Sequence, residues 1–165
     1  MEFENKGSSR TYIQLLVVTL KKKTEILDYL IHLTEKQELI IANDDFNDEE
    51  FLQVVSLKED SLRMLDELDN GFEQVYARVK EEITNQRYQY EAEIKEIQAL
   101  IMKITDDSVR LQVLEKRNKS KLEQYFANQR RQIKASKANS QTVANYYKTM
   151  TKQNEVPSFF YDKKN

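Results

Sequence analysis

Side chains that commonly carry catalysis are scarce in this sequence, and those present do not form a catalytic pattern. His32 is the only histidine among the 165 residues. It falls in the middle of a helical pattern with no accompanying serine or carboxylate pattern, so a surface or boundary histidine is a better interpretation than a catalytic triad. Cysteine is absent, which excludes thiol nucleophiles, disulfides and thiolate metal sites.

Phosphate-binding and metal-binding motifs are also missing. Gly7 and Gly71 are the only two glycines and lie too far apart for a glycine-rich phosphate loop. The acidic pairs Asp44-Asp45 and Asp106-Asp107 lack the glycine and the regular oxygen spacing of a calcium loop. One histidine cannot supply the two Glu-x-x-His pairs of a di-iron bundle. We therefore expect no enzymatic activity, no cofactor and no metal site, and interpret the chemistry of the chain as binding.

Aromatic residues near the end of the sequence are the strongest candidates for binding. Three of them are consecutive, although chain termini are usually loose and polar. A short amphipathic unit precedes them, beyond the point where the helical pattern of the chain fades. Such a unit can bind in a partner's groove, or it can fold back and cover an end of its own bundle. The candidate partner-binding residues are Val143, Tyr146, Tyr147, Met150, Phe159, Phe160 and Tyr161.

Charge is distributed unevenly along the chain. Residues 116–165 carry 12 Lys and Arg against 3 Asp and Glu, whereas residues 1–115 carry 14 against 25. A basic segment that contains aromatics such as Tyr125 and Phe126 can bind nucleic acid. These two aromatics fall on the apolar stripe of Leu122, however, which favours core side chains with a basic outer face that complements an acidic neighbour. Nucleic acid is therefore the least favoured partner.

The elements that must position these residues are long helices. Only 2 Gly and 1 Pro accompany 33% charged and 39% apolar residues, a composition typical of amphipathic helices and not of turn-rich sheet folds. We expect an all-α fold, namely an elongated antiparallel three-helix bundle or coiled coil with an amphipathic C-terminal tail. No apolar run has the length of a membrane span, and the first residues are polar. We therefore expect a soluble, cytoplasmic protein without membrane insertion.

Apolar residues at steps of three and four predict where the helices lie. The expected helices cover about 10–42, 48–105 and 108–137. Two Asp-rich breaks separate them, because Asn, Asp, Ser and Thr end one helix and cap the next. Residues 1–9 are expected to be a disordered lead, and residues 138–165 to form the amphipathic segment and the aromatic tail.

The order of these features resembles the FlgN-type flagellar export chaperones. Two long helices, with Lys36–Ile41 leading into Asp48–Phe51, are similar to the N-terminal half of that family. The segment Leu114–Leu122 is similar to its third helix. The ending, Tyr146-Tyr147-Lys148 followed by a polar stretch and Ser158–Lys164, looks like the usual close of the family.

The resemblance implies a cytoplasmic chaperone that binds unassembled hook–filament junction proteins of the flagellum and delivers them to the type III export apparatus. It also implies that the C-terminal region binds this cargo, through the seven residues named above. Two alternatives stay open: a structural coiled-coil adaptor or tether, and a nucleic-acid-binding helical protein. A homodimer formed through the long seams also stays open.

Overall fold

The computed structural model describes residues 2–132 and 144–149. Three long helices account for most of them: α1 (Glu2–Ala42), α2 (Asp48–Asn85) and α3 (Glu91–Gln132). A short helical segment follows at 144–149. The expected all-α helical bundle is confirmed. No helix within these residues combines the length and the apolar character needed to cross a membrane.

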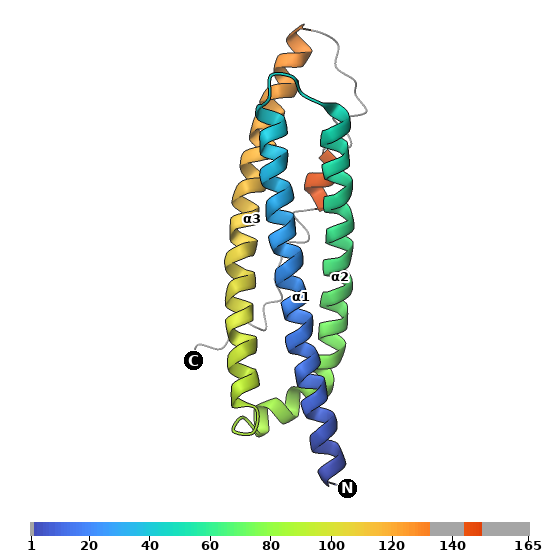
Figure 1. Ribbon diagram of the computed structural model, residues 1–165, viewed down its shortest axis with the longest axis vertical. Coiled ribbons are helices and arrows are strands. Elements are labelled where there is room, and N and C mark those ends of the chain that lie inside the picture. The colour runs from blue at the N-terminus through green and yellow to red at the C-terminus, as the bar shows by residue number, and fades with distance from the viewer. Residues whose placement is uncertain (1, 133–143, 150–165) are drawn as a thin grey trace.

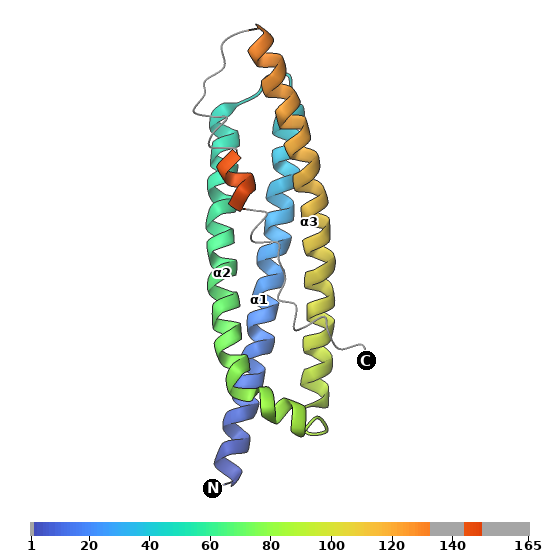
Figure 2. The same cartoon turned by 180° about the vertical axis from the view of Figure 1, so that it is seen from behind.

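The central position in the bundle belongs to α1. It packs along both α2 and α3, whereas α2 and α3 make little contact with each other over the described residues. The chain reverses direction twice, so that α2 runs antiparallel to its two neighbours (Figure 1). The three helices therefore form an open layer, and the segment 144–149 lies beside the upper part of α2 on one face of it (Figure 2).

Apolar seams hold the three long helices together. One continuous cluster of buried side chains includes Leu16 and Leu30 of α1, Phe51 and Leu62 of α2, and Leu111 of α3. Removing apolar surface from water stabilises the fold by about 25 cal/mol per Å². The same packing fixes the register of the helices, and with it the height at which polar side chains on the seams meet.

The connection between α1 and α2 lies where the sequence predicts it. Residue Ala42 ends α1, and Asp48 begins α2. The side chain of Asn47 caps α2 by accepting a hydrogen bond from the backbone N–H of Glu50 (3.2 Å). Acidic residues fill the first turn of α2, where the helix dipole favours negative charge.

The prediction of a second break at residues 105–108 was wrong, because these residues lie inside α3. The Thr105 hydroxyl donates to the carbonyl oxygen of Ile101 (2.8 Å). Lys103 Nζ donates to the carboxylate of Asp107, one turn further along (2.6 Å). Side chains that often cap helices are thus satisfied within the helix, so they do not interrupt it.

The true second connection is a turn at residues 86–90. The second helix therefore ends at Asn85 instead of about 105, and the third begins at Glu91 instead of about 108. The backbone N–H of Gln86 donates to the carbonyl oxygen of Glu82 (2.8 Å) and closes α2. Neither glycine nor proline occurs in this turn, so the usual composition signal for a break is missing.

The predicted start of the first helix also needs correction. The helix α1 begins at Glu2, inside the stretch 1–9 for which the sequence predicts disorder. Arg10 Nη2 donates to the carbonyl oxygen of Gln89 (3.0 Å), which ties this end of α1 to the turn at 86–90. A tertiary contact of this kind is not visible in local sequence. The predicted end of the third helix, residue 137, lies outside the described residues.

Candidate functional site

A buried ion pair between α2 and α3 is the most unusual chemical feature of the bundle. The side chain of Lys58 is fully buried, and that of Glu115 is only 6% exposed. The Lys58 ammonium group donates to Oε1 of the Glu115 carboxylate. Removing two charges from water carries a penalty of several kcal/mol per ion, and the mutual attraction compensates only where further hydrogen bonds are made. The pair therefore depends on the polar side chains around it.

Side chains from α1 and α3 supply these additional hydrogen bonds. Lys58 Nζ also donates to Oε1 of Gln37 (3.0 Å). The hydroxyl of Thr34 lies 3.0 Å from Glu115 Oε1, and Asn118 Nδ2 donates to the backbone carbonyl of Thr34 (2.9 Å). All three long helices thus contribute to one cluster. We call Thr34, Gln37, Lys58, Glu115 and Asn118 the polar core.

The segment 144–149 places a tyrosine directly on the polar core. The Tyr146 hydroxyl donates to Glu115 Oε1 (2.9 Å), and Lys58 Nζ lies 4.6 Å from the centre of the Tyr146 ring. The latter geometry is a cation–π contact. Tyr146 is fully buried and Tyr147 is 6% exposed, with their rings edge to face at 5.2 Å. One tyrosine therefore meets both charges of the ion pair.

Burial shifts the proton affinities of these groups. It lowers the pKa of Lys58 to about 8, against the opposing effect of the Glu115 carboxylate. It raises the pKa of the Tyr146 phenol, and the Glu115 carboxylate raises it further. The pKa of Tyr147 is raised by burial and by Glu115 as well. Both phenols therefore remain protonated near neutral pH, and Tyr146 is a fixed hydrogen-bond donor to Glu115.

The structure brings together two of the seven predicted partner-binding residues. Tyr146 and Tyr147 lie side by side and are buried against their own bundle. The segment 144–149 therefore packs on one face of the bundle, whereas the alternative expected it to cover a bundle end. The remaining predicted residues lie outside the described part of the chain; they are Val143, Met150, Phe159, Phe160 and Tyr161.

Sequence reasoning missed the polar core, although a signal for it exists. Lys58 falls between Val55 and Leu62 on the apolar stripe of α2, at steps of three and four residues. Glu115 and Asn118 interrupt the stripe of α3 in the same way. A charged or amide residue at a seam position is expected to be buried, and a buried charge needs a partner.

The basic side of α3 faces acidic side chains of α1. Arg117 and Lys121 both contact the carboxylate of Glu38, at 2.8 and 3.0 Å, and Arg110 contacts Glu35 at 2.7 Å. The hydrogen bond from Lys121 lowers the pKa of Glu38, while burial partly opposes it. These pairs are the charge complementarity expected as the alternative to nucleic-acid binding.

Both aromatics of the basic segment pack against other rings of the chain. The ring of Tyr125 stacks on Phe46 of the α1–α2 connection, with centroids 4.4 Å apart. It also packs edge to face against Phe126, which is partly buried at the core. The two aromatics thus close one end of the bundle, in agreement with their position on the apolar stripe of α3.

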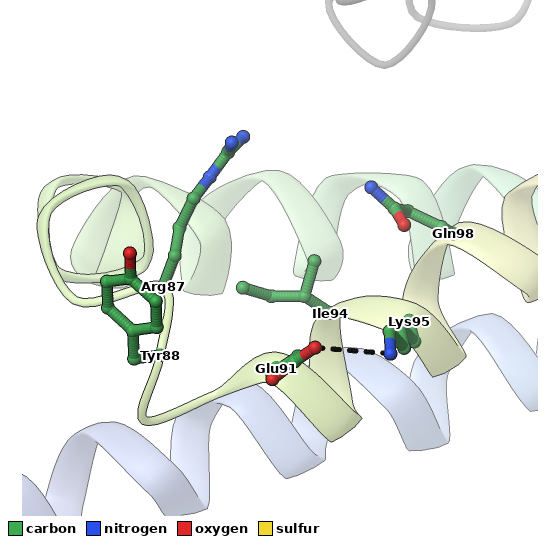
Figure 3. A pocket seen from close by; sticks show the side chains of 6 residues that line it. All are labelled: Arg87, Tyr88, Glu91, Ile94, Lys95 and Gln98. Carbon is green, nitrogen blue, oxygen red and sulfur yellow. Dashed lines mark ion pairs between the residues drawn. The ribbon is translucent and has the colours of Figure 1, made fainter.

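The opposite end of the bundle carries an open surface pocket. Figure 3 shows the turn and the start of α3 around it, with the Tyr88 ring projecting from the turn. Tyr88 is 95% exposed, and Glu91 pairs with Lys95 at 3.1 Å. The pocket is lined by Arg87, Tyr88, Glu91, Ile94, Lys95 and Gln98. These side chains offer no nucleophile paired with a base, and no group of three metal-binding side chains occurs among the described residues.

Two sites of different character therefore remain, a polar core covered by 144–149 and an exposed tyrosine at the far turn. Comparisons of the chain with protein-family models, with curated proteins and with solved structures found no match.

Proposed function

We propose that this protein is a FlgN-like export chaperone. In this role it binds unassembled hook–filament junction proteins of the flagellum in the cytoplasm and delivers them to the type III export apparatus. The C-terminal region, with the aromatic residues named above, makes the contact with the cargo. Binding is stoichiometric and buries apolar cargo surface during transit.

One observation carries the proposal: the aromatic pair Tyr146–Tyr147 lies on a small unit separate from the three long helices. Each long helix already buries its own apolar seam. The described residues 144–149 take their contacts from the long helices, since Tyr146 meets Lys58 of α2 and Glu115 of α3. Their conformation therefore depends on the surface they contact, and a cargo protein can provide that surface in place of the bundle.

A coiled-coil adaptor or tether is the second candidate, and an exposed apolar stripe favours it. Met102, Val109 and Val113 lie on the outward face of α3 and are more than half exposed. Their spacing of seven and four residues is typical of a helix–helix seam. If the protein is a tether, it should form an oligomer, and sedimentation equilibrium should show that Val109→Glu dissociates this oligomer. If it is a chaperone, Val109→Glu should leave cargo binding unchanged.

Cargo binding by aromatic variants tests the chaperone proposal. We expect Tyr146→Ala with Tyr147→Ala, and separately Phe159→Ala with Phe160→Ala, to weaken binding of a purified junction subunit at least tenfold. Isothermal titration calorimetry measures the affinity, and circular dichroism verifies that each variant keeps its helices.

The matched control is Tyr88→Ala, which removes an exposed tyrosine from the far end of the bundle. We expect this variant to bind the junction subunit with unchanged affinity. The proposal fails if the two double variants bind the subunit as tightly as the wild-type chain.

A further inference from the structure

The surface beneath 144–149 differs from an ordinary apolar groove because its centre is an ion pair. Tyr146 lies over Lys58 and donates to Glu115, so the docked segment withholds water from both charges. Desolvating charges opposes docking, while burying the two aromatic rings favours it. Docking of the segment therefore depends on the balance of these two contributions, whereas the seams of the three long helices are largely apolar.

The docked segment also leaves hydrogen-bonding capacity of the polar core unused. Glu115 Oε1 accepts from Lys58 and Tyr146 and lies 3.0 Å from the Thr34 hydroxyl, but Oε2 of the same buried carboxylate has no partner among the described residues. The same is true of Asn118 Oδ1. Buried polar atoms without a partner are unfavourable. A different helix that supplies a phenol and one further donor would satisfy this site better than 144–149 does.

The rim of this surface is acidic. Glu59 directly follows Lys58 on α2, and Glu123 lies about two turns beyond Glu115 on α3, with both side chains exposed. Burial is the main cause of the raised pKa of Tyr146 and of Tyr147, and Glu59 and Glu123, respectively, add to it. Both carboxylates therefore lie near the two rings. In the chain itself the two tyrosines are followed by Lys148, which is exposed. A basic residue after the aromatic pair suits the charge of the rim.

We propose that the surface centred on Lys58 and Glu115 is a receptor for an amphipathic helix that carries a tyrosine and a following basic residue, and that a helix of the exported cargo binds there in exchange for 144–149. The identity of the entering helix rests on the proposed chaperone function. The receptor itself rests on the geometry of the polar core.

A labelled peptide added to the full chain tests the receptor. The probe is a fluorescein-labelled synthetic peptide of residues 141–151, and fluorescence anisotropy measures its affinity. We expect Tyr146→Ala with Tyr147→Ala in the protein to bind the peptide at least tenfold more tightly than the wild-type chain, because its own segment no longer competes. The short peptide differs in this from a whole junction subunit, which also offers the surface that the released Tyr146 and Tyr147 contact under the proposed function. Tyr88→Ala should bind the peptide as the wild type does. Equal affinity of the double variant and the wild type would overturn the receptor.

A second comparison keeps the test valid if the double variant loses helicity. A peptide that carries Tyr146→Phe lacks only the hydroxyl group, and we expect it to bind the wild-type chain at least threefold more weakly than the original peptide. In a chain with Lys58→Met and Glu115→Leu this preference should disappear. A preference for the tyrosine peptide that survives in that chain would show that the ion pair does not recognise the phenol.

Competition with a junction subunit then tests the occupant. We expect the subunit to displace the bound peptide. A subunit that binds while the peptide stays in place overturns the exchange but leaves the chaperone function intact. If the peptide binds but the subunit does not bind at all, the chaperone function is overturned and the receptor proposal still holds.

Discussion

Two ion pairs within a single turn of α3 have opposite environments. Glu115 pairs with Lys58 inside the bundle, where both side chains are almost completely buried. Arg117 pairs with Glu38 at the surface, where the two side chains are 49% and 23% exposed. Water screens the second pair, and such pairs typically contribute 0–1 kcal/mol. The first pair is unscreened, so each charge is indispensable to the other. Substitutions at the two pairs should therefore differ strongly in effect.

The largest effect is expected from breaking the buried pair on one side only. Lys58→Met leaves the Glu115 carboxylate buried without its cation, and we expect the free energy of unfolding to fall by about 3–5 kcal/mol. Urea denaturation followed by circular dichroism measures this change.

Replacing both charges gives the matched comparison. Lys58→Met with Glu115→Leu removes the desolvation penalty together with the attraction, so its stability should lie within about 1 kcal/mol of wild type or above it. If the single and the double variant lose the same free energy of unfolding, the two buried charges do not compensate each other as the structure indicates.

The next largest effect is a pH dependence that only the buried pair can produce. The pKa of Lys58 is about 8 in the folded chain and 10.5 in an unfolded one. Between these values the unfolded state binds more protons at Lys58, so this group should make the free energy of unfolding rise with pH, by about 2 kcal/mol between pH 8 and pH 10 relative to a chain without the buried pair. The variant with Lys58→Met and Glu115→Leu should lack this rise.

Above pH 10 the sign reverses. The raised pKa of Tyr146 means that an unfolded chain loses phenolic protons before the folded chain does. The folded state then binds more protons, and stability falls as pH increases further. Chemical denaturation at half-unit intervals from pH 7 to pH 11 measures both arms. If the wild-type curve and that of the variant with Lys58→Met and Glu115→Leu run parallel from pH 8 to pH 10, the placement of Lys58 in the core is contradicted.

The comparison also shows what local sequence can and cannot predict. The hairpin of α1 and α2 follows from its Asn- and Asp-rich connection, and the apolar stripes follow from their spacing. The sequence also indicates that Lys58 and Glu115 occupy seam positions. It does not indicate that they form a pair, because their pairing depends on the register between α2 and α3.

The position of the second turn fixes that register. With a break near 105–108, Lys58 would lie about 70 Å from the turn and Glu115 about 10 Å from it, at 1.5 Å per residue. With the true turn at 86–90, both lie about 40 Å from it and meet at one height. The prediction placed the turn at the polar residues 105–108, but side chains there make their hydrogen bonds within α3. One wrong boundary was enough to hide the polar core.

A smaller effect is expected from removing a single hydroxyl at the buried pair. Tyr146→Phe keeps the ring over Lys58 but removes the hydrogen bond to the Glu115 carboxylate. Hydrogen bonds to charged groups contribute about 1.5–3 kcal/mol. We expect the free energy of unfolding to fall by an amount near the lower value. Hydrogen exchange of the amides of 144–149 should accelerate about tenfold. Tyr88→Phe, at the exposed turn, should change neither quantity.

The smallest effect is expected at the exposed pair. Glu38→Gln removes the carboxylate that Arg117 and Lys121 share at the surface, and the expected loss is about 0.5 kcal/mol at pH 7. Because these cations hold the pKa of Glu38 below its ordinary value, the contribution is complete above the ordinary pKa and is lost as pH falls through the lowered one. In 1 M salt, variant and wild type should become equally stable, since screening acts within about 3 Å. The loss of stability caused by Lys58→Met should be unchanged in the same salt. If salt abolishes that loss too, water reaches Lys58 and 144–149 does not seal the polar core.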